Sequence, residues 1–342
     1  MSAPFAMSDP SRPAGRTGRT LRPRRRAWAL LALLLCVLSI AALSSCGPVD
    51  RSWADRPQAI AGGGASGVYY AYGQQFARAL TAHLGARFAV QQTNGSVDNL
   101  ERVGSGRAVL GFAQGDAVAD AVAGTGAFEE AIPIVAVARL YDEYVHIVVR
   151  AGSDLHDLRD LGGRTISLGA RGSGVELVAR RILAAADVDV SAVRNPELGL
   201  EGSIAALRRG ELDAFFWVGG LPTPGIATLA DDTPIRLLSI PPAVVDAVNT
   251  AHAGAYRQAD FPIGGYGIDT ATATMTVPNY LVTRADAPED LIHDATAVLF
   301  DERAAIAGGA PAAALLDRRQ AIFTAPIPLH IGAVRYYRET HD

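Results

Sequence analysis

Blocks of apolar and polar residues alternate along the chain from about residue 58 onward, and they predict strands and amphipathic helices in turn. Apolar runs of strand length are separated by segments with the 3.6-residue period of helices. The predicted strands are 58–61, 87–93, 108–114, 132–140 and 145–150, and the predicted helices are 68–84, 96–106 and 115–124. This order is typical of a parallel sheet whose strands are connected by crossover helices.

The same order begins again in the second half of the chain, so the pattern predicts a second α/β unit. The further elements are strands at 165–169 and 235–240, a helix and a buried strand within 203–220, an extended segment at 275–284 and a helix at 288–302. The halves also echo each other, because Ser66 and Ser173 are 107 residues apart and Gly106 and Gly210 are 104 apart. The similar offsets suggest two lobes of one design, although any two α/β units share this order of strands, loops and helices.

The N-terminus carries the features of an export signal. A basic segment, Arg22–Arg26, precedes an apolar run, and small residues follow before Cys46. The ending "LSSC", Leu43–Cys46, resembles a bacterial lipobox, which implies cleavage before Cys46 and lipidation of its thiol. The alternative is a single-pass anchor, but the apolar run is a little short of the roughly 20 residues that a span needs. We therefore expect a lipoprotein held at the outer face of the cytoplasmic membrane.

Removal of the signal changes the composition that bears on function. It leaves 297 residues with 24 arginines and 34 acidic residues, so the formal net charge is near −10. The length predicts about two domains. An acidic chain without basic runs is a poor candidate for binding nucleic acid. Cys36 lies in the removed segment, so disulfides and cysteine chemistry are excluded, and the histidines lack metal-ligand spacing.

The stretch "AIAGGGASGVYYAYGQQFARAL" places Gly62, Gly64 and Gly67 between a predicted strand and a predicted helix, with G-x-G-x-x-G spacing. A dinucleotide site would need an acidic residue at the end of the next strand to bind the ribose. That strand ends "QQTNGS" without one. What remains is a helix N-terminus whose free N–H groups, close glycine backbone and nearby Ser66 can bind an anion.

Three more strand-to-helix loops carry polar groups at equivalent positions, where ligands bind in open α/β sheets. They are "TNGSVDN" (93–99), "FAQGD" (112–116) and "ARGSGVE", in which Ser173 precedes a helix and Glu176 follows three residues later. A capping box between Ser173 and Glu176 would also explain the last loop.

At these loops the chain resembles the TAXI family, the extracytoplasmic solute receptors of TRAP transporters. The motifs "GGASGVYY", "TNGSVDNLERVGSGRAVLGFAQGD", "YDEYVHIVVR", "GARGSGVE", "LDAFFWVGGLPTP" and "PIPLHIGAVRYYRE" carry the resemblance over essentially the mature chain. It implies an α/β, type II periplasmic-binding-protein fold, with two lobes joined by two crossover hinge strands and a ligand cleft between them. The implied divisions are 1–45 signal peptide, 46–57 tether, 58–146 first part of lobe 1, 147–274 lobe 2, and 275–342 return to lobe 1 with the C-terminal helix.

The resemblance also implies ligand-binding residues in this chain. They are Ser66, Gly67, Tyr69, Asn94, Ser96, Gln114, Tyr144 at the hinge, Ser173, Gly174 and Trp217. Trp217 would form an apolar wall where the family more often has Phe, and Arg171 stands where Pro is expected. Arg171 could bind a carboxylate directly or be solvated at the rim.

Simpler roles remain open for several of these residues. Tyr69 and Tyr70 are adjacent on one helix and cannot face the same way, so one of them packs in the core. Asn94 could form a turn with Gly95. Gln114 ends a buried apolar strand, where an unpaired amide would be costly, so a partner or ligand is expected there.

The family implies a binding receptor that closes on a small carboxylate, such as glutamate or a 2-oxoglutarate-like diacid, and delivers it to a TRAP permease, without a cofactor and as a monomer. A ligand-sensing lipoprotein of the same fold without a transport role is an alternative. A serine hydrolase is disfavoured, because "GASGV" and "RGSGV" lack the G-x-S-x-G pattern of a nucleophile elbow. If the ligand is an α-amino acid, Glu143 or Asp116 could meet its ammonium group.

Overall fold

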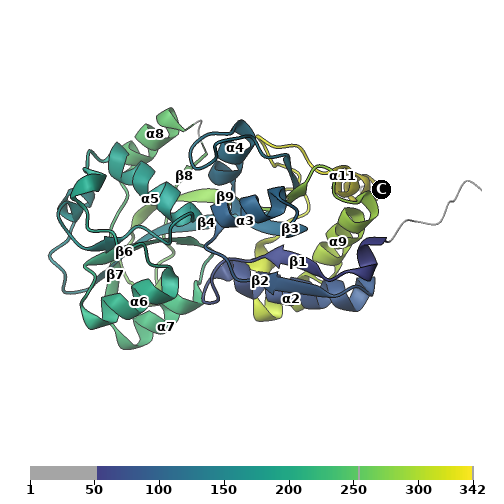
Figure 1. Ribbon diagram of the computed structural model, residues 1–342. Helices are drawn as coiled ribbons and strands as arrows, with labels where there is room; N and C mark the ends of the chain where they lie inside the picture. Colours follow the sequence, from purple (N-terminus) through teal and green to yellow (C-terminus); the bar gives the residue numbers. More distant parts are fainter. Residues whose placement is uncertain (1–51, 253–254, 341–342) are drawn as a thin grey trace, which may run out of the picture. The chain divides into compact units, whose positions relative to one another are not determined.

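The computed structural model describes residues 52–252 and 255–340, and Figure 1 shows how their elements are arranged. The predicted signal peptide, Cys46 and the first part of the tether lie outside the described residues. The strands are β1 (Gln58–Ala61), β2 (Phe88–Gln91), β3 (Leu110–Gln114), β4 (Ile134–Arg150), β5 (Ile166–Ser167), β6 (Ala214–Gly219), β7 (Ile235–Leu237), β8 (Arg257–Asp260) and β9 (Ala273–Arg284). The α-helices are α2 (Val68–Leu84), α3 (Ser96–Gly104), α4 (Gly115–Ala123), α5 (Gly174–Ala185), α6 (Leu200–Arg209), α7 (Pro224–Asp232), α8 (Pro242–Ala251), α9 (Glu289–Asp301), α10 (Arg303–Gly309) and α11 (Ile331–Glu339).

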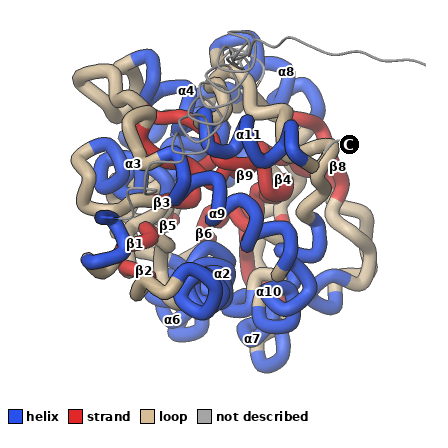
Figure 2. Tube along the Cα trace, turned by 90° about the vertical axis from the view of Figure 1, so that its right-hand side faces the viewer, coloured by secondary structure: helices blue, strands red, loops and turns tan. Residues whose placement is uncertain are grey.

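All the described strands belong to one mixed sheet, and Figure 2 shows the helices around it. The main strand order is β2-β1-β3-β9-β4-β6-β5, with β7 paired to β4 and β8 paired to β9. The short strands β1, β2 and β3 are parallel, as are β5 and β6, whereas β9 and β4 run antiparallel to their neighbours. Two parallel groups are therefore joined through an antiparallel pair.

The antiparallel pair, β4 and β9, crosses from one half of the sheet to the other. Strand β4 pairs with β9 from Ile134 to Tyr144, and with β6 from Tyr144 to Val149. Strand β9 pairs with β3 near its C-terminal end and with β8 near its start. The prediction of an α/β fold with two lobes and two crossover strands is confirmed by this topology.

Helix α2 illustrates why the sequence forms these elements. Its apolar positions Val68, Tyr72, Phe76 and Leu80 recur every four residues and are all buried, so they form one face against the sheet. The helix ends at Gly85, whose φ of 69° is a left-handed conformation that glycine adopts without steric cost. Predicted and observed bounds agree for this helix.

The prediction of separate strands at 132–140 and 145–150 was wrong, because β4 is continuous from Ile134 to Arg150. The polar segment between the two runs led to the predicted break. In the structure, Asp142 and Glu143 stay in the ladder opposite Pro278 and Val277 of β9, and the side chain of Glu143 is held by polar neighbours. The sequence also gave no prediction for α7, α8 or β8.

Four hydrophobic clusters divide the described residues into two lobes. Two clusters contain β1–β3, α2–α4 and α9–α11, which we call lobe 1, and two contain β5–β7 with α5–α8, which we call lobe 2 together with β8. The core changes along β4 between Tyr141 and Val145, and along β9 between Val277 and Tyr280. The boundaries 146/147 and 274/275 remain predictions.

Candidate functional site

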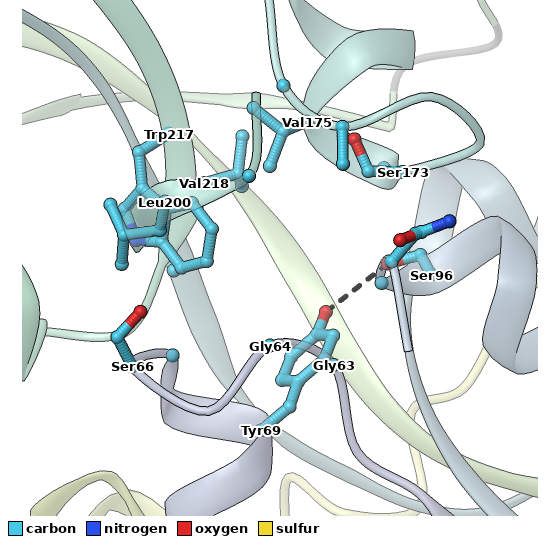
Figure 3. A pocket seen from close by; sticks show the side chains of 18 of the residues that line it. Gly63, Gly64, Ser66, Tyr69, Ser96, Ser173, Val175, Leu200, Trp217 and Val218 are labelled. Carbon is cyan, nitrogen blue, oxygen red and sulfur yellow. Dashed lines mark hydrogen bonds between the residues drawn. The ribbon is translucent and has the colours of Figure 1, made fainter. Parts of the chain in front are cut away.

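A cavity of about 400 Å³ lies between the two lobes at the carboxyl ends of β1, β2, β3 and β6. Lobe 1 contributes Gly63–Tyr69, Gln92–Ser96 and Gln114, β4 contributes Glu143, and lobe 2 contributes Gly169, Ala170, Ser173–Val175, Glu197–Gly202 and Phe216–Gly219. Nine of the ten predicted site residues line it; they are Ser66, Gly67, Tyr69, Asn94, Ser96, Gln114, Ser173, Gly174 and Trp217. Figure 3 shows several of these side chains converging from both lobes.

The glycine loop before α2 places the N-terminus of this helix at the cavity. Gly67 is the N-cap residue, with extended backbone and no side-chain capping bond, so the first-turn N–H groups of α2 lack a capping side chain. Gly67 also lies against the wall opposite, because a Cβ added there would be 3.3 Å from Cη2 of Trp217. The absence of a side chain at this position therefore lets the lobes approach closely.

Tyr69 is the member of the tyrosine pair that points into the cavity (Figure 3). Its ring stacks on Phe112 with centroids 5.5 Å apart, and its hydroxyl donates to Glu143 Oε2 at 2.9 Å. The hydroxyl also lies 3.4 Å from Ser96 Oγ and accepts a bond from Asn279 Nδ2 at 2.6 Å. Burial raises the pKa of Tyr69 well above its ordinary value, so it remains a neutral donor.

The N-termini of α3 and α5 face each other across the cavity. Gly95, the N-cap of α3, has φ of 121°, and its backbone lies against Ser173. The Asp98 N–H donates across the lobes to the Gly172 carbonyl at 3.2 Å. The two helix ends are thus joined directly on one flank of the site.

Ser173 combines both roles that the sequence left open. Its hydroxyl accepts from the Glu176 N–H at 3.1 Å, which caps α5, and the residue also lines the cavity. The Glu176 carboxylate accepts from the Gly172 N–H at 3.0 Å, so the capping box is shifted by one residue from the usual form.

Gln114 and Glu143 form the buried polar floor of the cavity. The exposed fractions are 2% for Gln114 and 0% for Glu143. Burial raises the pKa of Glu143 to about 8, although hydrogen bonds from Tyr69, Gln114 and Asn279 counteract this effect. Gln114 Oε1 has no hydrogen-bond partner among the described residues, and Gly174 of lobe 2 packs directly against it.

Trp217, Asn94 and Tyr144 occupy the margins of the site. The Trp217 indole forms a wall and donates through Nε1 to Thr223 Oγ1 at 3.0 Å. Asn94 lies at the exposed rim, where its N–H donates to Asp98 Oδ2 at 3.0 Å. Tyr144 is not among the lining residues, and its ring packs on Phe261 with centroids 5.6 Å apart, so the structure does not bring it to the cavity with the others.

The charged groups that line the cavity are all acidic: Glu143, Glu197 and Glu201. Arg171, a candidate carboxylate contact, instead pairs with Glu197 at 2.7 Å, and its side chain is 80% exposed at the rim. Glu143 was the residue that sequence reasoning undervalued. The available signal is a short acidic segment, Asp142 and Glu143, flanked on both sides by strand-like residues.

A second polar cluster joins the lobes away from the cavity. Arg181 of α5 donates to Asp116 Oδ2 at 3.0 Å and to Asp120 Oδ2 at 2.7 Å, both on α4. The Tyr256 hydroxyl, from lobe 2, donates to Asp116 Oδ2 at 2.5 Å. Only 7% of the Arg181 side chain is exposed. Asp116 therefore serves as an ion-pair partner between lobes and not as a cavity residue.

Between residues 52 and 252 and between 255 and 340, no group of three or more His, Cys, Asp or Glu side chains could hold a metal ion. In the same part of the chain, none of the helices combines the length and apolar character needed to cross a membrane.

The chain is similar to several solved binding proteins. The alkanesulfonate-binding protein SsuA from Xanthomonas axonopodis pv. citri is 15% identical, with TM-score 0.45, over 82% of this chain and 83% of that chain. PhnD1 from Prochlorococcus marinus, solved with methylphosphonate, is 13% identical, with TM-score 0.46, over 71% and 83%. The ligand-binding component of an ABC-type import system from Staphylococcus aureus is 12% identical, with TM-score 0.46, over 76% and 84%.

A family model covers nearly all of the described chain. The model of the NMT1-like family matches residues 60–340, which include every predicted site residue and both crossover strands. The protein therefore belongs to the NMT1-like family.

Proposed function

We propose that the protein is an extracytoplasmic receptor that captures a small carboxylate between its lobes and delivers it to a membrane permease. The observation that carries this proposal is the convergence of the α2, α3 and α5 N-termini on one cavity. Helix N-termini present unpaired N–H groups and partial positive charge, so they bind anions without a basic side chain. A cavity of about 400 Å³ is also within the range of small-molecule sites.

Closure of the lobes would be the recognition event. Residues of both lobes line the cavity, and β4 and β9 are the continuous strands between them. Hinge closure around a ligand is a known transition of two-lobed binding proteins. Because Gly67 meets Trp217 and Gly174 meets Gln114, glycines lie where the lobes approach most closely. A closed receptor would present a surface that an open one lacks.

Thermal unfolding tests this function. The purified protein, stripped of bound ligand, would be screened with L-glutamate, 2-oxoglutarate, other carboxylates and amino acids. A ligand at about 100 times its Kd stabilises the fold by about 2.7 kcal/mol. The expected rise in Tm is about 4–5 °C for a chain of this size. It should disappear in Ser173→Ala and Gln114→Ala. Stabilisation by sugars or nucleosides alone would leave the fold standing and contradict the carboxylate site.

The permease and the anchor are further parts of the proposal. The TAXI resemblance supports a TRAP permease, driven by an ion gradient, and the lipobox-like segment supports lipidation at Cys46. Uptake of labelled ligand should collapse when the ion gradient is dissipated. Uptake that instead follows ATP supply would point to an ABC permease and correct this part. Mass spectrometry of the mature N-terminus should find an acylated Cys46, and an unmodified Cys46 thiol would contradict lipidation.

A further inference from the structure

Glu143 is a carboxyl group on the cavity floor without a cationic partner. Its side chain is fully buried, and the side chains that hydrogen-bond to it are neutral: the Tyr69 hydroxyl donates to Oε2 at 2.9 Å, and the Tyr141 hydroxyl lies 3.5 Å from Oε1. Gln114 and Asn279 supply the other side-chain hydrogen bonds. No lysine or arginine lines the cavity in the described part of the chain. Burial raises the pKa of Glu143 to about 8, so the empty site holds the group largely protonated at neutral pH. A buried carboxylate is costly unless it is paired, so a cation brought by a ligand would favour the ionised form.

A second acceptor lies on the same floor. Gln114 Oε1 is buried and unpartnered among the described residues. An unpaired buried acceptor is also unfavourable, and it would be satisfied by a ligand that donates hydrogen bonds. A protonated amine carries both a positive charge and up to three donors. One such group can therefore pair with the Glu143 carboxylate and donate to Gln114 Oε1.

The anion-binding end of the cavity is close to this floor. The Tyr69 hydroxyl lies 2.9 Å from Glu143 Oε2 and 3.4 Å from Ser96 Oγ, so it bridges the two side chains. Ser96 is the first residue of α3, and Figure 3 shows its contact with Tyr69. The carboxyl group is therefore two hydrogen-bond lengths from the start of a helix. A molecule with adjacent anionic and cationic groups can contact both.

We propose that Glu143 is the counterion for a protonated nitrogen of the ligand, and that the cavity therefore binds an amino acid in preference to the 2-oxo acid of the same shape. This inference rests on the proposed carboxylate receptor and names which chemistry its ligand carries. A dianion such as 2-oxoglutarate would face an uncompensated acidic floor, which like-charge repulsion disfavours. Glu143 is in this account a specificity-determining residue.

Isothermal titration calorimetry on the purified protein in detergent tests the inference with matched pairs. The pairs are glutamate and 2-oxoglutarate, alanine and pyruvate, and leucine and 4-methyl-2-oxopentanoate. For at least one pair, the amino acid should bind about 10-fold or more tightly than its 2-oxo acid. Glu143→Gln should weaken amino acid binding by about 10- to 100-fold, the range expected for a lost charged hydrogen bond. The same variant should leave the 2-oxo acid unchanged or more tightly bound.

The controls separate this role from a structural one. Glu101→Gln removes the same charge from an exposed position further along α3 and should change neither affinity. A merely structural role of Glu143 would weaken both members of a pair equally. A 2-oxo acid that binds more tightly than its amino acid, and is weakened by Glu143→Gln, would show a protonated Glu143 donating to the ligand and overturn the inference alone. If no member of any pair binds, the carboxylate receptor fails as well.

Discussion

Two buried carboxyl groups close to the boundary between the lobes have opposite surroundings. Asp116, two residues after Gln114, receives Arg181 and the Tyr256 hydroxyl from lobe 2. Glu143, on the crossover strand β4, receives only neutral donors from lobe 1 and the crossover strands. Within residues 52–252 and 255–340, a cation is supplied at Asp116 and none at Glu143. The first group joins the lobes, and the second is left for a ligand.

The difference shows how a two-lobed receptor can use one buried carboxyl group to join its lobes and another to recognise a ligand. Removing one partner from a buried ion pair leaves the other charge uncompensated, so a pair such as Asp116 and Arg181 specifies which surfaces meet. A buried carboxyl without a cation, such as Glu143, is costly to ionise in the empty protein and gains a charged partner on binding. Stability and specificity thus depend on different residues.

A large effect on stability is expected at Asp116, the carboxyl group that has a cationic partner. Arg181→Met leaves Asp116 and Asp120 without their cation and should lower the free energy of unfolding by about 3–5 kcal/mol. Arg180→Ala is the matched control, because the neighbouring arginine forms an exposed pair with Glu176 and should cost less than about 1 kcal/mol. Urea denaturation measures both. Equal losses in the two variants would show that the buried cluster has no special role.

The pH dependence of stability tests Glu143, the carboxyl group without a cationic partner among the described residues. The pKa of Glu143 is raised from 4.5 to about 8, so between these values the folded state binds more protons than the unfolded state. The contribution of Glu143 to stability is fully present below about pH 4.5 and is lost as the pH rises through 8. Glu143→Gln should remove this loss, which amounts to about 5 kcal/mol.

The comparison of the two pH profiles isolates this group. His146, whose pKa burial lowers to about 4, makes the free energy of unfolding rise with pH between about 4 and 6.5. That slope is common to wild type and Glu143→Gln, so it cancels in their difference. Urea denaturation without ligand, at intervals from pH 4.5 to 9, gives the difference. Parallel profiles would mean that Glu143 is ionised or neutral to the same extent in both states.

A smaller effect, on ligand affinity, is expected where Gly174 of lobe 2 packs against Gln114. In Gly174→Ala the new Cβ would overlap Gln114 Oε1 and approach Ser96 Oγ to 2.8 Å, so the lobes could not close as far. Overpacking of this kind costs about 1–3 kcal/mol, or about 10- to 100-fold in ligand affinity if the closed form alone bears it. Gly152→Ala, which meets no atom within 4 Å, is the control. Calorimetric titration with the ligand found in the thermal screen measures both, and equal affinity in the two variants would place ligand recognition away from this contact.

The smallest effect is expected at the cavity wall. Trp217→Phe keeps an aromatic surface and loses the Nε1 bond to Thr223, which contributes about 0.5–1.5 kcal/mol. The affinity should fall only a few-fold in the same titration. A loss as large as that of Gly174→Ala would mean that the indole contacts the ligand through a polar group and does more than form a wall.

The sequence predicted the fold where local pattern and tertiary packing agree. Helix α2 was placed at its observed bounds, because an apolar face every four residues and a terminal glycine both specify it. Strand β4 was divided in two, because its polar centre looks like a break until the neighbouring strand and Tyr69 are known to cover it. A buried polar residue in a strand has a local signature that resembles a loop.

The site shows the same limit. Loop residues such as Ser173 and Gln114 follow strands directly, so topology alone brings them to one edge of the sheet. Tyr144 failed to join them because adjacent residues of a strand face opposite sides, and its neighbour Glu143 occupies the inner face. The pairing of Arg181 with Asp116 joins residues 65 positions apart across two lobes, so no local sequence pattern predicts it.

A crystal structure of the protein grown with L-glutamate tests the central claim most directly. The account predicts density for one small molecule in the cavity between the lobes. Its carboxylate should lie at the N-termini of α2, α3 or α5, and its nitrogen should lie within hydrogen-bond distance of Glu143. A molecule bound with its nitrogen away from Glu143, or bound outside this cavity, would contradict the account.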